Sequence, residues 1–500
     1  MQDLMIEWKD DKSHLYEQIY SYIKEEIRKG KLLYREKLPS TRSLAQYLQV
    51  SRSTVEVAYE QLLSEGYIEA VPYKGYFVAK VEELYRLREV MADKTDREKT
   101  DGQAGGAAGC MAEENAGWVD FSPNAIEMRS FPFGTWRRIN KNVLNQDNRE
   151  LFLPGDPKGD FGLRETIARY LHASRGVNCN AAQIIVGAGN DYLLLLLRYV
   201  LGEDCRAAFE NPTYPRARQI FGLFSKEVTS AAADENGIIV DELEKSGANV
   251  VYVMPSHQYP TGRVMPIGRR AELLNWAVAD DQRYVIEDDY DSEFRYRGKP
   301  IPSLQASDTA EKVIYIGTFS KSIAPAIRVS FLVLPKGLME RYEERCSCFS
   351  STVSRIDQAV LEEFLKSGAF ERHLNRMRKE YSKKHEILLE GLKPFLKNFR
   401  VSGENAGLHV LLTSCRGRSE EWMKERARQN GVKVYGLSEA MTGTDGQKRD
   451  QAVRAGLFSD ADAGRYGSLR TMGGTVLLGF GGLTEEAIED GLERLKKAWL

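Results

Sequence analysis

From Trp118 to Leu500, the chain alternates short apolar segments with amphipathic segments long enough to form helices. The apolar segments that we interpret as strands are 183–186, 206–209, 249–253, 284–286, 313–316 and 330–334. Several are apolar on both faces, which is typical of a mostly parallel sheet covered by helices on both sides. From about residue 367, a long charged helix over 371–392 introduces a further group of strands and helices. We therefore predict an α/β domain over residues 118–500, completed by a small α+β lobe.

Residues 1–80 have a different pattern and form a separate predicted unit. Ile19, Ile23 and Ile27 recur at helical spacing, so that one face of a first helix is apolar. Two further helices and two short strands follow, at 40–48, 52–65, 67–70 and 76–78. Three helices and a hairpin predict a winged helix-turn-helix, which is an α+β fold.

Between these units, residues 81–117 lack the features of a folded domain. The stretch 101–109 contains glycine, alanine and polar residues but no large apolar side chain. Such a segment cannot bury enough apolar surface to fold, so we expect a flexible linker here. The predicted organisation is therefore a domain over 1–80, a linker over 81–117 and a larger domain over 118–500.

Composition limits the class of protein. A chain of 500 residues is too long for one hydrophobic core, and 42% hydrophobic with 28% charged residues is typical of a soluble globular protein. No apolar run reaches the length of a membrane span and the N-terminal residues are mostly polar, so we expect a cytoplasmic protein. The six cysteines are scattered, which favours reduced thiols and predicts no metal site.

Lys321 follows the apolar segment 313–317 and ends the motif Thr-Phe-Ser-Lys. A lysine at the end of a buried strand can have a lowered pKa, and its neutral amine can attack an aldehyde. Arg328, seven residues later, could bind a phosphate. Upstream, Asp288 could pair with a pyridinium nitrogen and Tyr290 with a phenolate oxygen. These groups hold pyridoxal phosphate (PLP) as a Schiff base. The alternative is a surface lysine and arginine after a strand, which the combination of four residues disfavours.

The N-terminal unit has the features of a DNA-binding module, although the whole chain carries a net charge of only −2. Residues 24–54 contain eight basic and three acidic residues, a local positive surplus suited to DNA phosphates. Several polar residues fall near predicted helix N-termini, where they can meet phosphates and base edges. The residues that we expect to contact double-stranded DNA are Arg42, Arg52, Ser53, Thr54, Lys74 and Gly75. The alternative is a winged helix that binds protein.

Residues 14–78 resemble the DNA-binding domain of the GntR family. The resemblance is carried by Leu38-Pro39-Ser40-Thr41-Arg42, Ser51-Arg52-Ser53-Thr54-Val55 and Gly75-Tyr76-Phe77-Val78, among other motifs. It implies that the positions of Arg42, Arg52, Thr54 and Gly75 contact operator DNA. A further contacting position, often an arginine in the family, is Glu56 in this sequence and departs from the pattern.

Residues 118–500 resemble fold-type-I aminotransferases, and the pairing of both domains resembles the MocR/GabR-type subfamily of GntR transcriptional regulators. By this resemblance, Lys321 forms the Schiff base, Asp288 is the partner of the pyridine nitrogen, and Tyr290 is the partner of the ring oxygen. The other residues expected to bind PLP are Ser320 and Arg328 at the phosphate, Gly189, Asn190 and Asp191 in the loop that cradles it, Tyr214 stacked on the ring, and Tyr259 beside it.

Some positions depart from the aminotransferase pattern. Pro154 stands where the family's tyrosine often reaches the phosphate of the partner subunit, and Leu477 lies where an arginine commonly binds the substrate carboxylate. Arg216 matches a carboxylate-binding position of GABA-responsive members, and we expect it to bind the effector. His257 falls beside the pocket, where a lone histidine is more often structural than catalytic. The absence of the tyrosine at position 154 and of the arginine at position 477 favours sensing of an effector over catalytic turnover.

The predicted function is a PLP-dependent transcriptional regulator that senses a small amine or amino acid, or PLP itself, through a Schiff base at Lys321. Its predicted partners are operator DNA, the effector and a second copy of the chain in a homodimer, with no membrane. The alternative is an active aminotransferase fused to a DNA-binding module.

Overall fold

The computed structural model describes residues 15–64, 67–71, 74–78, 117–296, 302–404, 406–442 and 474–500. The chain divides into two compact units, Met1–Ala107 and Ala108–Leu500. All of the predicted linker except Gly117 lies outside the described residues, so the boundaries at residues 80 and 118 stay predictions. Within the described part of the chain, no helix is both long enough and apolar enough to span a membrane.

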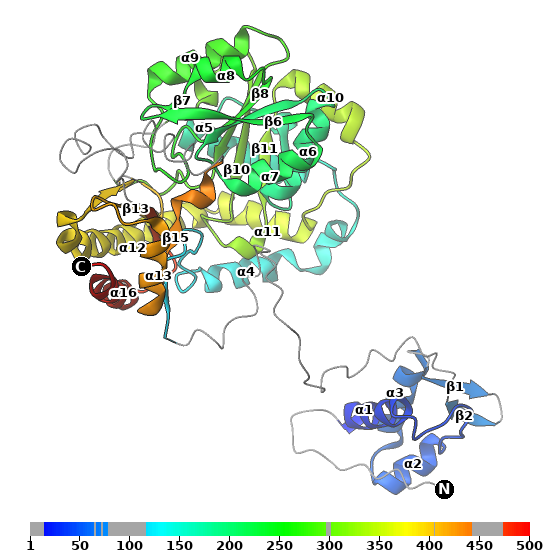
Figure 1. The fold of residues 1–500 in the computed structure, drawn as a ribbon. Coiled ribbons are helices and arrows are strands. Elements are labelled where there is room, and N and C mark those ends of the chain that lie inside the picture. Colours follow the sequence, from blue (N-terminus) through cyan, green and yellow to red (C-terminus); the bar gives the residue numbers. More distant parts are fainter. Residues whose placement is uncertain are drawn as a thin grey trace. The chain divides into compact units, whose positions relative to one another are not determined.

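The first unit is the winged helix-turn-helix that its sequence predicts (Figure 1). Its elements are α1 (Leu15–Arg28), α2 (Thr41–Leu48), α3 (Arg52–Ser64), β1 (Ile68–Val71) and β2 (Gly75–Val78). The two strands pair antiparallel. Ser40 caps α2 by accepting a hydrogen bond from the Ser43 N–H at 3.1 Å. Ile19, Val55 and Leu62 are fully buried, so the apolar face of α1 packs against α3.

The second unit contains a large lobe built on an eight-stranded sheet. In spatial order its strands are β4 (Ile184–Gly187), β11 (Ser330–Val333), β10 (Val313–Thr318), β9 (Tyr284–Asp289), β8 (Val250–Val253), β5 (Arg206–Asn211), β6 (Glu227–Asp234) and β7 (Gly237–Ile238). The strands β10, β9, β8, β5 and β6 run parallel, whereas β11 and β7 run antiparallel to their neighbours. Each of the six segments interpreted as strands in the α/β domain contributes a strand to this sheet.

Helices cover both faces of the large sheet (Figure 1). They are α5 (Phe161–Arg175), α6 (Asn190–Leu201), α7 (Pro215–Phe224), α8 (Val240–Lys245), α9 (Ile267–Val278), α10 (Lys336–Cys346) and α11 (Arg355–Lys366), and α4 (Phe133–Val143) packs on α11. The helices α6, α7 and α10 share a buried cluster with Ile286, whereas α8 and α9 share another with Val285. Neighbouring strand residues therefore face opposite sides of the sheet, which explains why apolar residues such as Val285 and Ile286 follow one another directly.

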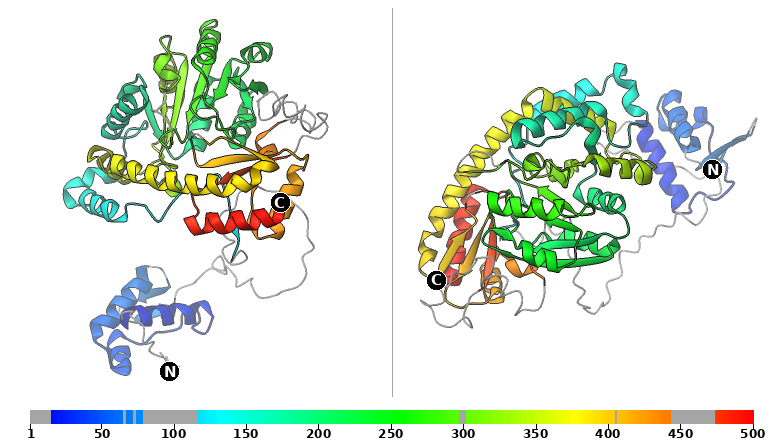
Figure 2. Two further views of the ribbon diagram at one scale, coloured as in Figure 1. Left: turned by 90° about the vertical axis from the view of Figure 1, so that its left-hand side faces the viewer. Right: turned by 90° about the horizontal axis from the view of Figure 1, so that it is seen from above.

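A smaller lobe completes the second unit. Its sheet has the order β12 (Phe399–Ser402), β13 (His409–Ser414), β16 (Thr475–Gly479) and β15 (Tyr435–Gly436), and its helices are α12 (Ala369–Leu392), α13 (Glu420–Gln429) and α16 (Glu485–Trp499). The predicted long charged helix is α12, and α16 lies beside it (Figure 2). The strand β3 (Val119–Asp120) pairs with β14 (Val432–Lys433). The chain that follows the predicted linker is therefore anchored on this lobe.

Candidate functional site

A pocket lies at the edge of the large sheet where β5, β8, β9 and β10 end. Because these strands are parallel, the side chains that follow them converge at this edge. The pocket is lined by Asn124, Asn190, Asp191, Tyr214, Arg216, Met254, Tyr259, Asp288, Tyr290, Thr318, Ser320, Lys321 and Arg328. Every cofactor and effector residue predicted from the sequence lines this pocket except Gly189, which directly precedes the lining residue Asn190.

Lys321 lies three residues beyond the end of β10 and extends into the pocket. Its Nζ atom donates a hydrogen bond to the carbonyl oxygen of Pro123 at 3.1 Å. Burial lowers the pKa of the Lys321 ammonium to about 8, although the negative charge of Asp291 opposes this shift. A substantial fraction of this amine is therefore neutral near pH 7.5, as a nucleophile for an aldehyde requires.

Two adjacent carboxylates on β9 point to opposite sides of the sheet. Asp289 Oδ2 accepts hydrogen bonds from Arg175 Nε at 2.7 Å and from the Tyr315 hydroxyl at 2.5 Å. Asp288 lines the pocket, and its Oδ2 atom accepts from the Tyr252 hydroxyl. Burial raises the pKa of Asp288 to about 7, while the Tyr252 hydrogen bond opposes the shift. The buried Asp288 Oδ1 atom has no hydrogen-bond partner among the described residues, so it can accept from a ligand N–H.

A positively charged cradle lies at the start of α6. Gly189 caps this helix with φ of +88°, and a Cβ atom there would lie 2.3 Å from Arg328 Nη2. Glycine is therefore required for the Arg328 guanidinium to approach the helix. Arg328 Nη2 also lies 3.4 Å from Asp191 Oδ2. The first N–H groups of the helix, the Asn190 side chain and Arg328 are suited to binding a phosphate.

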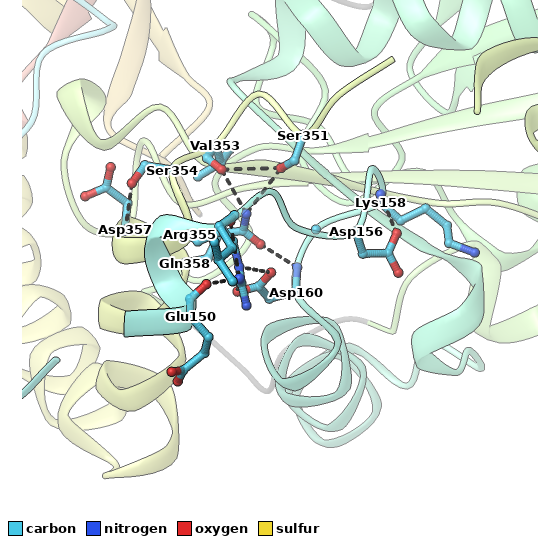
Figure 3. A network of polar contacts seen from close by, with 12 residues as sticks. Glu150, Asp156, Lys158, Asp160, Ser351, Val353, Ser354, Arg355, Asp357 and Gln358 are labelled. Carbon is cyan, nitrogen blue, oxygen red and sulfur yellow. Dashed lines mark hydrogen bonds and ion pairs between the residues drawn. The ribbon is translucent and has the colours of Figure 1, made fainter. Parts of the chain in front are cut away.

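A polar network joins the start of α11 to the turn before α5 (Figure 3), and a hydrogen bond near it reaches the loop before α6. The Ala188 N–H donates to Thr352 Oγ1 at 3.0 Å. Beyond Thr352, Gln358 Oε1 accepts from the Asp160 N–H at 2.7 Å, and Arg355 Nε donates to Asp160 Oδ1 at 3.0 Å. The start of α11 thus joins the turn before α5 to the loop that precedes α6.

Aromatic rings form the opposite wall of the pocket. The rings of Tyr214 and Tyr259 meet edge to face, with centroids 5.9 Å apart. Tyr259 packs against an apolar cluster that contains Leu411, Leu437 and Leu477. The position where aminotransferases commonly carry a carboxylate-binding arginine is therefore part of a buried apolar wall.

Three lining residues were not predicted from the sequence: Asn124, Met254 and Thr318. Thr318 belongs to the motif that ends in Lys321, so that motif could have indicated it. Asn124 comes from the chain just after the predicted linker, where no local pattern signals a pocket. Among the described residues, no group of histidine, cysteine and acidic side chains could hold a metal ion.

The predicted DNA-contacting residues occupy two helix starts and the tip of the hairpin. Arg42 is exposed in the first turn of α2, and Arg52, Ser53 and Thr54 begin α3. Lys74 lies in the turn before β2, and Gly75 is the first residue of that strand. Arg52 Nε lies 2.8 Å from Glu56 Oε1, so the acidic departure from the family pattern pairs with a predicted DNA contact. The basic residue at the start of α3 is thus partly neutralised when DNA is absent.

Comparison with known proteins identifies relatives of both units. Residues 118–443 match the family described as aminotransferase class I and II, and residues 15–78 match the bacterial regulatory proteins of the gntR family. The uncharacterized HTH-type transcriptional regulator YdeL of Bacillus subtilis is 40% identical over 97% of this chain and 96% of its own length. The probable rhizopine catabolism regulatory protein MocR of Rhizobium meliloti is 29% identical over 97% of this chain and 94% of its own length. A solved kynurenine aminotransferase of Pyrococcus horikoshii is similar with a TM-score of 0.62 and 25% identity, covering 76% of this chain and 90% of that chain.

Proposed function

We propose that this chain, which belongs to the MocR-type subfamily of GntR transcriptional regulators, binds PLP in its aminotransferase-like unit and senses a small amine or amino acid there. The observation that carries the proposal is the chemistry of the pocket. It combines the amine of Lys321, the unpaired buried oxygen of Asp288 and the guanidinium of Arg328. These groups fit the aldehyde, the ring nitrogen and the phosphate of PLP.

Each residue would have a defined task. When bound, PLP supplies an aldehyde that reacts reversibly with primary amines. Lys321 provides the amine that holds the cofactor, and Asp288 places negative charge at the ring nitrogen. Arg328 and the first N–H groups of α6 bind the phosphate. Tyr214 covers the ring and excludes water from the reacting carbon.

Pro123 connects the pocket to the segment that follows the predicted linker. The hydrogen bond from Lys321 Nζ to the Pro123 carbonyl oxygen exists when no ligand competes for the amine. Attachment of PLP to this amine would remove the bond, and an effector amine that displaces Lys321 from PLP would free Nζ to form it again. Pro123 lies three residues after β3, which adjoins the predicted linker. Effector binding would therefore alter a segment that is continuous in sequence with the DNA-binding unit.

The main alternative is complete transamination. The distinguishing experiment incubates the PLP-loaded protein with a panel of amines and amino acids, and then recovers the cofactor. A sensor should change its visible absorbance with one class of amine and return the cofactor as the aldehyde. An aminotransferase should return it as pyridoxamine phosphate. A protein that responds to none of them, but whose DNA binding changes with PLP alone, would be a PLP sensor.

Arg216→Ala should weaken a carboxylate-bearing effector while sparing PLP binding. Arg216 is exposed at the pocket, and its Nη1 atom is 3.5 Å from Asp191 Oδ2, an ion pair loose enough to be exchanged for a ligand. A charge-assisted hydrogen bond to a carboxylate contributes roughly 1.5–3 kcal/mol, so affinity should fall on the order of ten- to hundredfold. The measurement compares absorbance titrations with the acid and amide forms of one effector. Arg218→Ala, on the same helix but outside the pocket lining, is the control. A variant that keeps the full preference for the acid would exclude Arg216.

We also propose that the second unit forms a homodimer through exposed apolar side chains. Phe133 on α4 is 59% exposed, Phe152 at the end of the 3-10 helix Gln146–Phe152 is 70% exposed, and Phe161 on α5 is 62% exposed. All three elements pack on α11. Sedimentation should give about twice the chain mass of 56.6 kDa. Phe152→Ser combined with Phe161→Ser should shift the protein toward monomer, whereas Leu223→Ser on α7, also 70% exposed, should not. A monomeric wild type would contradict the proposal.

A further inference from the structure

A pair of buried side chains behind Tyr290 has no part in the function proposed above. His257 follows β8, Asp291 follows β9, and each side chain is 3% exposed. His257 Nδ1 lies 2.8 Å from Asp291 Oδ1. The same nitrogen lies 3.0 Å from the hydroxyl oxygen of Tyr290, which lines the pocket. One imidazole nitrogen therefore meets both a carboxylate and the phenol that faces the cofactor site.

These contacts decide where the imidazole carries its proton. An ionised carboxylate only accepts hydrogen bonds, so the Asp291 oxygen requires a proton on His257 Nδ1. A proton on Nε2 would instead be a buried donor without an acceptor, because Nε2 has no hydrogen-bond partner among the described residues. With Nδ1 protonated, the Tyr290 oxygen can accept from the imidazole but cannot donate to it. The hydroxyl proton of Tyr290 is then free to point into the pocket.

Neighbouring groups keep the imidazole in this orientation. Gly407 packs against the ring with φ of +76°, and a Cβ atom there would lie 2.1 Å from His257 Cε1. The His409 ring lies on β13 with its centroid 6.0 Å away, and its Nε2 atom is 2.8 Å from the Pro260 carbonyl oxygen. His257 therefore has little room to turn and release Asp291.

We infer that His257 and Asp291 are positioning residues that keep the Tyr290 hydroxyl as a hydrogen-bond donor to the ring oxygen of PLP. The inference rests on the proposed function, because the ring oxygen belongs to that cofactor. Burial also raises the pKa of Tyr290 well above its usual value, so the hydroxyl retains the proton that it would donate. A histidine that served only packing would leave the properties of bound PLP unchanged.

The predicted consequence is a shift in the spectral pKa, the pH at which the visible absorbance of bound PLP changes. A donated hydrogen bond stabilises negative charge on the ring oxygen. The negative charge on the ring oxygen would be largest at high pH, after the proton that this oxygen shares with the Lys321 nitrogen has been lost. The Tyr290 donor therefore lowers the spectral pKa. Loss of His257 should raise it by about half a unit to one unit, the equivalent of one net hydrogen bond.

Other titratable groups surround this cluster, at the ends of β8, β9 and β10 and on β13. They are Asp288, Asp289, Tyr259, Tyr296, His409 and Lys321. The variants at His257 leave all of them in the protein. A change in the spectral pKa can therefore be assigned to the imidazole or to Tyr290.

The first test uses the protein without cofactor. The chain has six histidines, and nitrogen-15 labelling of these residues allows NMR to identify which ring nitrogen is protonated. The signal of His257 is assigned by its loss in His257→Asn. We expect the proton on Nδ1. A proton on Nε2 alone would overturn the inference, whether or not the protein binds PLP.

The second test titrates the PLP-loaded protein by absorbance. His257→Leu should raise the spectral pKa, whereas His257→Asn should restore it, because an amide N–H can replace the Nδ1 donor. His172→Asn is the control, because His172 is exposed near the end of α5 and does not line the pocket. In a Tyr290→Phe background, His257→Leu should add no further shift.

The outcomes separate this inference from the proposed function. An unchanged spectral pKa in folded His257→Leu, or a full additional shift in the Tyr290→Phe background, would overturn it. If His257→Leu does not fold, two results still test the inference. They are the tautomer of His257 in the wild type and the difference in spectral pKa between His257→Asn and Tyr290→Phe. Failure of the wild type to take up PLP would instead refute the proposed function.

Discussion

Alanine at position 321 should abolish covalent capture of PLP. Lys321 is the one lysine among the described residues that line the pocket, and burial lowers its pKa to about 8. Its amine is thus both placed and partly deprotonated for reaction with an aldehyde. Borohydride reduction of the wild type with PLP should attach the label to the peptide that contains Lys321. The Lys321→Ala variant should show no visible absorbance band from bound PLP and no label.

The pH dependence of capture provides an independent check on the same residue. The neutral amine is the nucleophile, so the capture rate should rise as pH increases through about 8 and then level off. Lys336→Ala is the control, because this exposed lysine pairs with Glu311 outside the pocket. A label on Lys312, whose Nζ atom donates to backbone carbonyl oxygens of Asp280 and Asp281, would contradict the assignment.

The elements of the fold that could be predicted are those specified by local pattern. The strands β8 and β10 and the first half of β9 consist mainly of apolar residues that are buried on both faces, so their composition indicates a covered sheet. The strand β6 could not be recognised in this way, because it contains a single large apolar residue, Val228, and most of its residues are only partly buried. Its place in the sheet depends on pairing with β5, a contact between segments that are distant in sequence.

The same distinction applies to the pocket. Residues that directly follow a predicted strand, such as Lys321 and Asp288, could be named from motifs. Asn124 could not, because it reaches the pocket through contacts of the small lobe, including a hydrogen bond from the Gly479 N–H to the Phe121 carbonyl oxygen at 2.9 Å. The alternation along β9 agrees with the motif, because it brings Asp288 and not the adjacent Asp289 to the pocket.

The pairing of His257 with Asp291 is a tertiary contact that could not be predicted from the sequence. The two residues follow different strands, and they meet because β8 and β9 run parallel with Val253 opposite Glu287. From sequence alone, His257 was a lone histidine beside a pocket. Its hydrogen bonds to Asp291 and Tyr290 are the reason that we infer a role in orienting the Tyr290 hydroxyl rather than a role in packing alone.

Replacing both Arg42 and Arg52 with alanine should weaken DNA binding at least about thirtyfold, because each lost base contact costs about 1–3 kcal/mol. Both side chains are exposed in the first turn of a helix, where they can reach phosphates or base edges. The measurement is a titration of a duplex selected from a random pool by the wild-type protein, at several salt concentrations. A lost phosphate contact should weaken all sequences alike and reduce the salt slope by about one.

Glu56 supplies the matched control within the same helix. Its carboxylate forms an exposed ion pair with Arg52, and such pairs contribute at most about 1 kcal/mol to stability. Glu56→Gln should therefore leave the fold intact but strengthen DNA binding, because it removes a negative charge near the phosphates and releases Arg52. The absorbance of bound PLP should not change in any of these variants. Unaltered DNA affinity in the double arginine variant would exclude these helix starts as the DNA contact, and would favour a winged helix that binds protein.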